Sequence, residues 1–321
     1  MKRFYIGIDT SNYTTSCALF DAKECRVLSN VKRLLSVAEG ERGLRQSDAV
    51  FAHIKNLPSV TYEAMAEIDP KALAGVGVSA APRDADGSYM PCFLAGVAAA
   101  STLANGAKVP LHSFSHQAGH VTAAIYSSSS PDLLDREFVA FHVSGGTTEM
   151  LSVKPSDVGF SIEKLGGTAD LNAGQAIDRI GVMMGLGFPC GPALEELALS
   201  NTERLVRGGV SVKECECNLS GLENQAKKLL ADGKSKEYTA AYVLDFVGRT
   251  LIKLTENALD GRGMPVLFAG GVMSNSLIKE MIKKKGFDAR FAEPKLSSDN
   301  AVGTALLCAA AEEGWGFWTD R

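Results

Sequence analysis

The alternation of short apolar runs with longer amphipathic segments constrains the fold of this chain most. Apolar runs of strand length are separated, along most of the sequence, by segments whose apolar residues recur at helical spacing. Strands are predicted over residues 3–9, 14–20, 25–32, 74–79, 137–143, 148–154, 160–165, 265–269 and 288–292. Helices are predicted over residues 46–68, 91–106, 115–126, 171–185, 192–200, 221–231, 236–260, 274–285 and 299–313. This pattern predicts an α/β protein with mixed sheets covered by helices.

A polar stretch, "SSSSPD" at residues 127–132, divides the chain. The part before it opens with "FYIGIDTSNYTTSCALF" and the part after it with "FVAFHVSGGTTEMLSV". Each reads as an apolar strand, a turn of small hydroxyl or glycine residues, a Thr-Thr step and a second apolar strand. The similarity predicts two lobes that each begin with a β-hairpin, and the alternative is two unrelated hairpins.

The tips of these hairpins expose backbone N–H groups and hydroxyls, which suit phosphate oxygens. A further turn, Ala269-Gly270-Gly271, joins a strand to a helix near Ser274 and aims a helix N-terminus at an anion. Two such hairpins followed by a strand–Gly-Gly–helix turn are the pattern of the actin, hexokinase and Hsp70 ATPase superfold, in which duplicated lobes clamp a nucleotide. We therefore expect a first lobe over residues 1–130, completed by a C-terminal helix in 298–321, and a second lobe over 131–297.

Two of the five histidines, His116 and His120, lie four residues apart in a predicted helix that Ser115 can cap. Residues at this spacing share one face, and neutral imidazoles suit zinc or iron(II). Two ligands are too few for a metal site, so a third must come from elsewhere in the chain. The alternative interpretation is that the two histidines are solvent-facing or hydrogen-bonded polar side chains without a metal. Gly119 lowers the stability of a helix by about 1 kcal/mol relative to alanine. A glycine at this position therefore indicates that another backbone or a ligand packs closely against it.

The other histidines suggest structural roles. His53 lies in a long amphipathic helix, His112 at a strand end, and His142 within an apolar strand, where we expect a core position. Seven scattered cysteines, with Cys215 and Cys217 the one close pair, lack zinc-knuckle spacing and indicate reduced thiols.

Net charge and hydropathy bear on whether the chain binds nucleic acid strongly or spans a membrane. The formal charge of −4 argues against a strongly basic nucleic-acid binder, although a local patch or a partner can supply positive charge. No apolar run reaches the roughly 18 residues of a membrane helix. The basic and then apolar start is interrupted by Asp9 and is interpreted as a strand, so we expect a cytoplasmic protein without membrane partners.

Several blocks, spread over nearly the whole chain, resemble the TsaD family of tRNA threonylcarbamoyladenosine synthases, formerly called sialoglycoproteases. They are "HQAGH" at 116–120, "VSGGT" at 143–147, "NAGQAIDRIGVMMGLGFPCGPALEELA" at 172–198, "LSGLEN" at 219–224, "AGGVMSN" at 269–275 and "SSDNAVGTALL" at 297–307.

The resemblance implies one divalent metal, iron or zinc, held by His116, His120 and Asp299. Asp299 lies near the start of a helix, where a carboxylate is favourable. The resemblance also implies an adenine nucleotide, ATP or an acyl-adenylate, as ligand. Its expected contacts are Thr10, Ser11, Ser144, Gly145, Gly146, Thr147, Asp178, Gly191, Gly270, Gly271 and Asn275. Asp178 would accept a hydrogen bond from a ribose hydroxyl, and the alternative is a surface helix carboxylate paired with Arg179 or a neighbour.

The implied reaction transfers a threonylcarbamoyl group from threonylcarbamoyl-AMP to N6 of the adenosine next to the tRNA anticodon. The metal would polarise the carbamoyl carbonyl, and the tRNA amine would attack it. No catalytic side chain is assigned beyond the metal site, which agrees with the lack of a Ser-His-Asp arrangement or nucleophile elbow.

The chain departs from the family pattern near the expected ligand site. The acidic first hairpin of the family becomes Asn12-Tyr13-Thr14, its Ser-Gly-Gly-His becomes a block ending in Thr147, and its Pro-Gly-Gly-Pro contains Cys190. These changes suggest a divergent paralogue. The alternatives are a related carbamoyl or acyl transferase, or an ATPase, with a non-tRNA acceptor, and a non-catalytic member of a synthase complex. A related-fold partner subunit or a homodimer is expected as the assembly.

Overall fold

The computed structural model describes residues 3–11, 13–36 and 44–319, and it divides into two compact units. Unit 1 comprises Met1–Arg136, Lys154–Ile162 and Leu296–Arg321, and unit 2 comprises Glu137–Val153 and Glu163–Lys295. Asn12 of the first hairpin and the last two residues of the predicted C-terminal segment lie outside the described residues.

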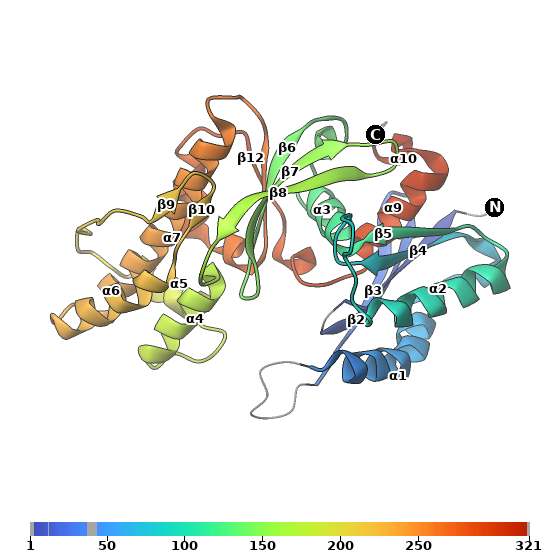
Figure 1. Ribbon diagram of the computed structural model, residues 1–321, viewed down its shortest axis with the longest axis horizontal. Coiled ribbons are helices and arrows are strands. Elements are labelled where there is room, and N and C mark those ends of the chain that lie inside the picture. The colour runs from blue at the N-terminus through green and yellow to red at the C-terminus, as the bar shows by residue number, and fades with distance from the viewer. Residues whose placement is uncertain (1–2, 12, 37–43, 320–321) are drawn as a thin grey trace. The chain divides into compact units, whose positions relative to one another are not determined.

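Unit 1 is built on a five-stranded sheet in the order β3-β2-β1-β4-β5 (Figure 1). The strands are β1 Phe4–Asp9, β2 Thr14–Asp21, β3 Arg26–Leu34, β4 Leu73–Ala81 and β5 Leu111–Ser115. The helices are α1 Gln46–Ala64, α2 Phe93–Ala107, α3 His116–Ser127, α9 Val302–Glu313 and α10 Gly316–Thr319, with 3₁₀ turns at Pro70–Ala72, Pro131–Asp135 and Pro294–Leu296.

The period-2 alternation of β1 assigns its side chains to two helical layers. Ile6 and Ile8 belong to a core cluster with Leu57 of α1 and Ala100 of α2. Gly7 points the other way, because a Cβ atom there would lie 2.3 Å from the carbonyl oxygen of Ala301, next to α9. Helices α1 and α2 therefore cover one face of the sheet, and α9 covers the other.

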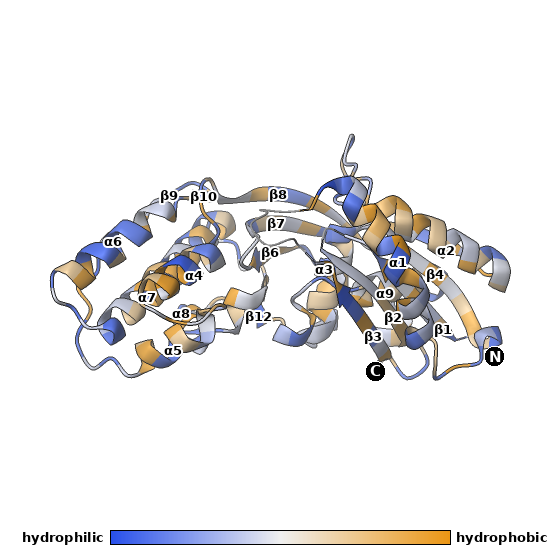
Figure 2. Ribbon diagram, turned by 90° about the horizontal axis from the view of Figure 1, so that it is seen from below, coloured by the Kyte–Doolittle hydropathy of each residue, from blue (hydrophilic) through white to orange (hydrophobic). Residues whose placement is uncertain are grey.

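Unit 2 contains a seven-stranded sheet in the order β12-β11-β6-β7-β8-β10-β9. Its strands are β6 Phe138–Val143, β7 Thr148–Pro155, β8 Phe160–Thr168, β9 Val212–Lys213, β10 Glu216–Cys217, β11 Val266–Ala269 and β12 Ala289–Phe291. Its helices are α4 Ala173–Met183, α5 Gly191–Leu199, α6 Ser220–Ala231, α7 Lys236–Leu259 and α8 Ser276–Lys283, with a 3₁₀ turn at Gly271–Ser274. Helix α7 is buried along most of its length, whereas the surface helix α6 is largely hydrophilic (Figure 2).

The two sheets share one pairing pattern. Strand β1 pairs antiparallel with β2 and parallel with β4, and β6 pairs antiparallel with β7 and parallel with β11. The predicted α/β class with mixed sheets is thus confirmed. The prediction missed β5, β9, β10 and α10, which are short, and β5 lies at an edge of its sheet with alternate positions exposed. None of the helices in the described ranges is long and apolar enough to cross a membrane.

Helix α6 of unit 2 begins without a capping side chain of its own. The carboxylate of Asp170 fills this role from the β8–α4 loop, accepting from the N–H groups of Leu219 at 2.8 Å and Ser220 at 3.2 Å. It also accepts from the N–H of Leu171 at 2.6 Å. Burial would raise the pKa of Asp170, but these hydrogen bonds, together with the Ser220 hydroxyl, lower it to about 2.

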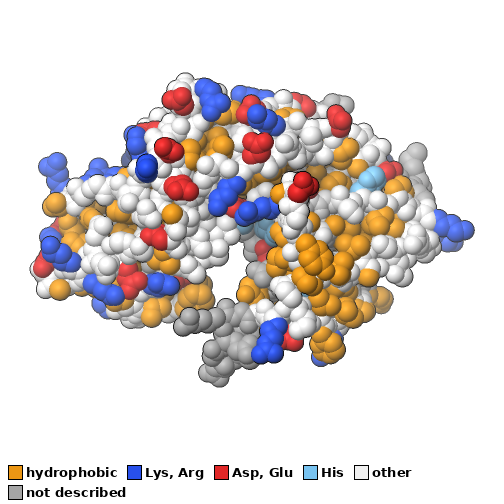
Figure 3. Space-filling view, viewed as in Figure 1, with side chains coloured by type: hydrophobic (Ala, Val, Ile, Leu, Met, Phe, Trp, Pro, Cys, Tyr) orange, Lys and Arg blue, Asp and Glu red, His pale blue; other side chains and the backbone are white. Residues whose placement is uncertain are grey.

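Large apolar side chains also stand exposed on the surface of unit 1 (Figure 3). Phe51 and Ile54 of α1 and Leu94 of α2 are each more than half exposed.

Candidate metal centre and hairpin tips

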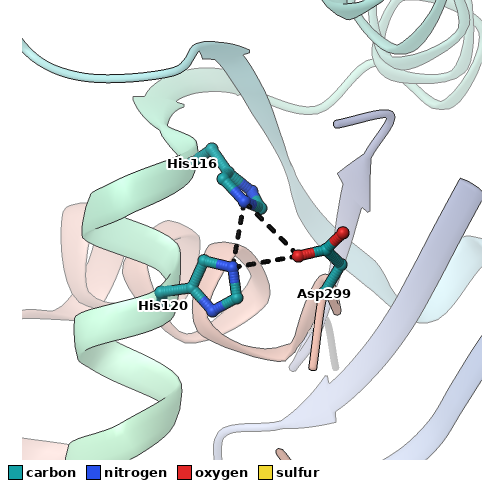
Figure 4. Close-up of side chains that lie close together, drawn as sticks. All are labelled: His116, His120 and Asp299. Carbon is teal, nitrogen blue, oxygen red and sulfur yellow. Dashed lines mark hydrogen bonds and ion pairs between the residues drawn. The ribbon is translucent and has the colours of Figure 1, made fainter. Parts of the chain in front are cut away.

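The side chains of His116, His120 and Asp299 converge within unit 1 (Figure 4). The two Nε2 atoms are 2.9 Å apart, and Oδ1 of Asp299 lies 3.3 Å from Nε2 of His120 and 3.7 Å from Nε2 of His116. Ligand atoms about 2.0–2.1 Å from a shared tetrahedral ion stand about 3.4 Å apart, so the three atoms are spaced to hold one ion. All three residues are partly buried.

Helix α3 presents the two histidines on one face, as their spacing predicts. The predicted cap is confirmed, because the Ser115 hydroxyl accepts from the N–H of Ala118 at 3.1 Å. The same hydroxyl donates to Asp84 at 2.7 Å, which ties the start of α3 to the loop after β4.

Close packing of backbones brings Asp299 to this helix. A Cβ atom at Gly303 of α9 would lie 1.8 Å from the carbonyl oxygen of Gly119, and one at Gly119 would lie 3.0 Å from the Thr304 hydroxyl. The close approach expected at Gly119 is therefore present, and it is made by α9. Just before α9, the Asn300 amide donates to the carbonyl oxygens of Leu296 and Ser298 and fixes the turn that carries Asp299.

Asp9, at the end of β1, is a further member of the site. Its Oδ2 lies 2.8 Å from Nδ1 of His116, and its side chain is 1% exposed. A carboxylate can only accept, so Nδ1 of His116 carries a proton, which leaves Nε2 as the nitrogen available to a metal ion. Sequence reasoning noted Asp9 only as a break in an apolar run. The feature of the sequence that could have identified Asp9 is a carboxylate at the end of an otherwise apolar strand.

Both carboxylates of the site are held ionised. Burial would raise the pKa of Asp9, but the charge and hydrogen bond of His116 and hydrogen bonds from Ser11 and Ser79 lower it below the usual range. Burial likewise opposes ionisation of Asp299, and the hydrogen bond and charge of His120 outweigh it, so that its pKa is also lowered. Ionised oxygen ligands are the form that a metal cation requires.

Thr10 and Ser11, predicted as substrate contacts, are buried and bonded within the protein. The Thr10 hydroxyl donates to the carbonyl oxygen of Cys92 at 3.0 Å and accepts from the N–H of Gly96. The N–H of Ser11 donates to Asp9 at 2.9 Å, and its hydroxyl bonds to the same carboxylate. Thr10 therefore fixes the start of α2, and Ser11 orients the aspartate behind His116.

The second predicted tip, Ser144–Thr147, lies between β6 and β7 of unit 2. Its Gly145 and Gly146 are exposed, and the Ser144 hydroxyl accepts from the N–H of Thr147 at 3.1 Å. Gly174, in the first turn of α4, packs on this tip, because a Cβ atom there would lie 2.6 Å from the nitrogen of Gly145.

The strand–Gly-Gly turn lies beside the same tip. Gly270 has a φ of +102°, and a Cβ atom there would lie 2.2 Å from the carbonyl oxygen of Val143. After Gly271 a 3₁₀ turn intervenes, so α8 begins at Ser276 rather than near Ser274 as predicted. Asn275 is 7% exposed and caps α8 by accepting from the N–H of Ile278 at 3.0 Å. Unit 2 thus places the β6–β7 tip, the start of α4 and the turn after β11 side by side.

Asp178 of α4 accepts from the N–H of Cys190 at 2.8 Å. Arg179 instead lies 3.8 Å from Glu223, so of the two partners considered in the alternative, Arg179 is not the one that Asp178 contacts, whereas a neighbouring backbone N–H is. Gly191 begins α5 next to Cys190, and no atom lies within 4 Å of a Cβ placed on it.

The other histidines have structural surroundings. Nδ1 of His53 lies 2.8 Å from the Thr15 hydroxyl in the core of unit 1, and Nε2 of His112 lies 2.6 Å from Glu312. His142 lies on β6 as predicted, but its side chain is partly exposed, so the expected core position is wrong. Polar groups of the neighbouring tip begin two residues later, which explains why this end of the strand is not enclosed.

Fold and site together define an α/β protein of the actin, hexokinase and Hsp70 superfold that carries a His-His-Asp cluster. The family model for TsaD, the tRNA N6-adenosine threonylcarbamoyltransferases, matches residues 26–306, and the chain belongs to this family.

Curated relatives cover most of the chain. The tRNA N6-adenosine threonylcarbamoyltransferase of Thermotoga neapolitana is 28% identical over 94% of this chain and 91% of its own length. The enzyme of the same name from Thermus thermophilus is 31% identical over 94% of this chain and 90% of its own length.

Solved structures agree on the fold. HypF of T. kodakarensis matches with a TM-score of 0.61 at 14% identity, over 98% of this chain and 48% of that chain. The activator of the 2-hydroxyisocaproyl-CoA dehydratase from Clostridium difficile matches with a TM-score of 0.54 at 13% identity, over 96% and 95% of the two chains.

Proposed function

We propose that this chain transfers a threonylcarbamoyl group from threonylcarbamoyl-AMP to N6 of the adenosine next to the anticodon of tRNA. Membership of the TsaD family and the names of the curated relatives support the reaction. The observation that carries the proposal is the convergence of His116, His120 and Asp299 in unit 1. Their ligand atoms all lie within 4.8 Å of one another, close enough to hold one ion.

The proposed ligand set is Nε2 of both histidines and one oxygen of Asp299. Two imidazoles and a carboxylate fit zinc or iron(II) and leave coordination positions for substrate. A divalent ion held by these residues would supply Lewis acidity to the carbamoyl carbonyl. Asp9 is proposed as the positioning residue, because its carboxylate fixes the ring orientation and tautomer of His116.

The other residues of the proposed site bind the adenylate and take no part in the bond-making step. The exposed tip Ser144–Thr147 offers backbone N–H groups and hydroxyls for the adenylate phosphate, with Gly270 and Gly271 beside it. The remaining oxygen of Asp178 is proposed to accept from the ribose. The N6 amine of the tRNA adenosine attacks the carbamoyl carbon, AMP leaves with the electron pair of the broken C–O bond, and the amine loses one proton.

The proposed setting is the cytoplasm, with a related-fold partner subunit or a second copy of the chain. None of the seven cysteines, all of which lie in the described ranges, forms a disulfide bond, and reduced thiols fit such a compartment.

The test is threonylcarbamoylation of tRNA by purified protein supplied with metal, threonylcarbamoyl-AMP and any partner subunits. Mass spectrometry of the digested tRNA should reveal the modified adenosine. His120→Ala should lose bound metal and product together. His112→Ala is the matched control, because His112 pairs with Glu312 and not with the cluster, so it should keep both. Absence of product from the unchanged protein in a competent system would exclude this function.

A second candidate is transfer of the same group to an acceptor other than tRNA. The observation that favours it is the first hairpin, where Tyr13 and Thr14 replace two family carboxylates and Thr14 is 4% exposed. This candidate gains if the metal-loaded protein consumes threonylcarbamoyl-AMP but leaves every tRNA unmodified.

A further inference from the structure

Lys32 of β3 is held beside the candidate metal centre by the register of the sheet. Ser16 is the Cα partner of Lys32, and Asp9 is the Cα partner of Ser16. Directly opposed residues of antiparallel strands point to the same face. Lys32, Ser16 and Asp9 therefore form one row, on the face of the sheet that carries His116 and Asp299.

A hydrogen bond locates the end of the lysine side chain. Nζ of Lys32 donates to the hydroxyl of Ser298 at 2.9 Å, and Ser298 directly precedes Asp299. Ser298 belongs to the turn that the Asn300 amide fixes, so both partners are held by ordered backbone.

Among the residues that the structure describes, no carboxylate forms a salt bridge with Lys32. Lys32 is partly buried, although its hydrogen bond to Ser298 lies at the surface. Burial lowers the pKa of Lys32, and the negative charge of Asp299 offsets this in part. A partly buried ammonium loses part of its hydration, and a bound anion would compensate for that loss.

We propose that Lys32 and Ser298 form an anion-binding subsite that receives an anionic oxygen of the donor substrate beside the metal centre. The inference rests on the proposed function. Threonylcarbamoyl-AMP carries two anionic groups, the amino-acid carboxylate and the phosphate. An ammonium with three N–H donors and a serine hydroxyl suit an oxyanion of either source.

Lys32 is thus a positioning residue rather than a reacting one. Holding an oxyanion at Ser298 limits how the donor lies against the ligand set of His116, His120 and Asp299. Fixing a reactant in this way lowers the barrier without a new covalent step.

The next residue of the strand provides a matched control. Arg33 points to the opposite face, where it forms an ion pair with Glu63 of α1 at 2.5 Å. Lys32→Met and Arg33→Met remove the same charge from neighbouring positions, and only the first removes it from the face of the metal centre. Lys32→Arg keeps the charge and serves as the rescue variant.

The experiment measures binding by calorimetry to metal-loaded protein, with AMP as the phosphate probe and N-carbamoyl-L-threonine as the carboxylate probe. Lys32→Met should weaken one probe by about tenfold or more, the loss expected for one hydrogen bond to a charged group. The weakened probe identifies the phosphate or the carboxylate as the source. Arg33→Met should bind both probes as the unchanged protein does, and Lys32→Arg should stay within about threefold of it.

The subsite is overturned if Lys32→Met binds both probes as tightly as the unchanged protein, or if the unchanged protein binds neither. A weakened probe in Lys32→Met together with unmodified tRNA would retain the subsite and reject the proposed reaction. Metal content, measured in parallel, should stay the same in all four proteins, because the ligands themselves are untouched.

Discussion

The backbones of Gly119 and Gly303 touch, since a Cβ atom on Gly303 would lie 1.8 Å from the carbonyl oxygen of Gly119. This contact joins α3, which carries His116 and His120, to α9, which follows Asp299. The geometry of the candidate metal centre therefore depends on two residues that have no side chains.

Gly303→Ala is expected to separate the two helices. The added methyl group cannot be accommodated beside a backbone carbonyl, and overpacking of this kind costs about 1–3 kcal/mol of unfolding free energy or more. Thermal unfolding and metal content should both fall. Gly106→Ala in α2 is the control, because nothing lies within 4 Å of its Cβ position and alanine favours a helix. Unchanged metal content in a folded Gly303→Ala protein would contradict the dependence of the site on this contact.

Asp9→Asn should weaken metal binding by about 10–100-fold, the range found when a partner behind a ligating histidine is lost. An amide can donate to Nδ1 of His116, which then no longer has to carry the proton, so Nε2 loses its fixed role as ligand. Competition with a coloured chelator measures the affinity.

Asp84→Asn is the control for Asp9→Asn. Asp84 accepts from the Ser115 hydroxyl at the start of the same helix, and its hydrogen bond to Ser115 does not involve the imidazole of His116. Equal metal affinities of the two variants would show that the carboxylate of Asp9 has no special role.

Local periodicity predicts the α/β class and the main helices, and the four-residue spacing singles out His116 and His120. Asp299 joined them only through the family resemblance. Asp9 was missed as a partner of His116 because 107 residues separate them and only the folded sheet brings them together. Lys32 was missed for the same reason, since its partner Ser298 lies 266 residues later. The lobe boundaries at residues 130 and 297, and the roles of the predicted ligand residues, stay predictions.

Asp170 should make the stability of unit 2 depend on pH. Its folded pKa of about 2 is below the ordinary value of 3.8, so its stabilisation is present above about pH 4 and is lost as the pH falls toward 2. The carboxylate is exposed, and solvent screening limits the effect to about 1 kcal/mol. Asp170→Asn should therefore unfold more readily than the unchanged protein in urea at pH 7, with the difference shrinking near pH 2.

Asp232→Asn is the control, because it tests whether removing any negative charge at an end of α6 lowers the stability toward urea. Asp232 is at the C-terminal end of that helix, where a negative charge opposes the helix dipole, so its removal should leave stability unchanged or slightly higher. A gap between Asp170→Asn and the unchanged protein that persists undiminished at pH 2 would refute the capping role.

Gly174→Ala should impair nucleotide binding through the Ser144–Thr147 tip. The new Cβ atom would lie 2.6 Å from the nitrogen of Gly145, so α4 or the tip must move. Phosphate held by backbone N–H groups is sensitive to such displacement, and we expect AMP affinity to fall about tenfold or more. Gly221→Ala in α6 is the control, since no atom lies within 4 Å of its Cβ position. If calorimetry gives the same AMP affinity for both variants, the β6–β7 tip is not the phosphate site.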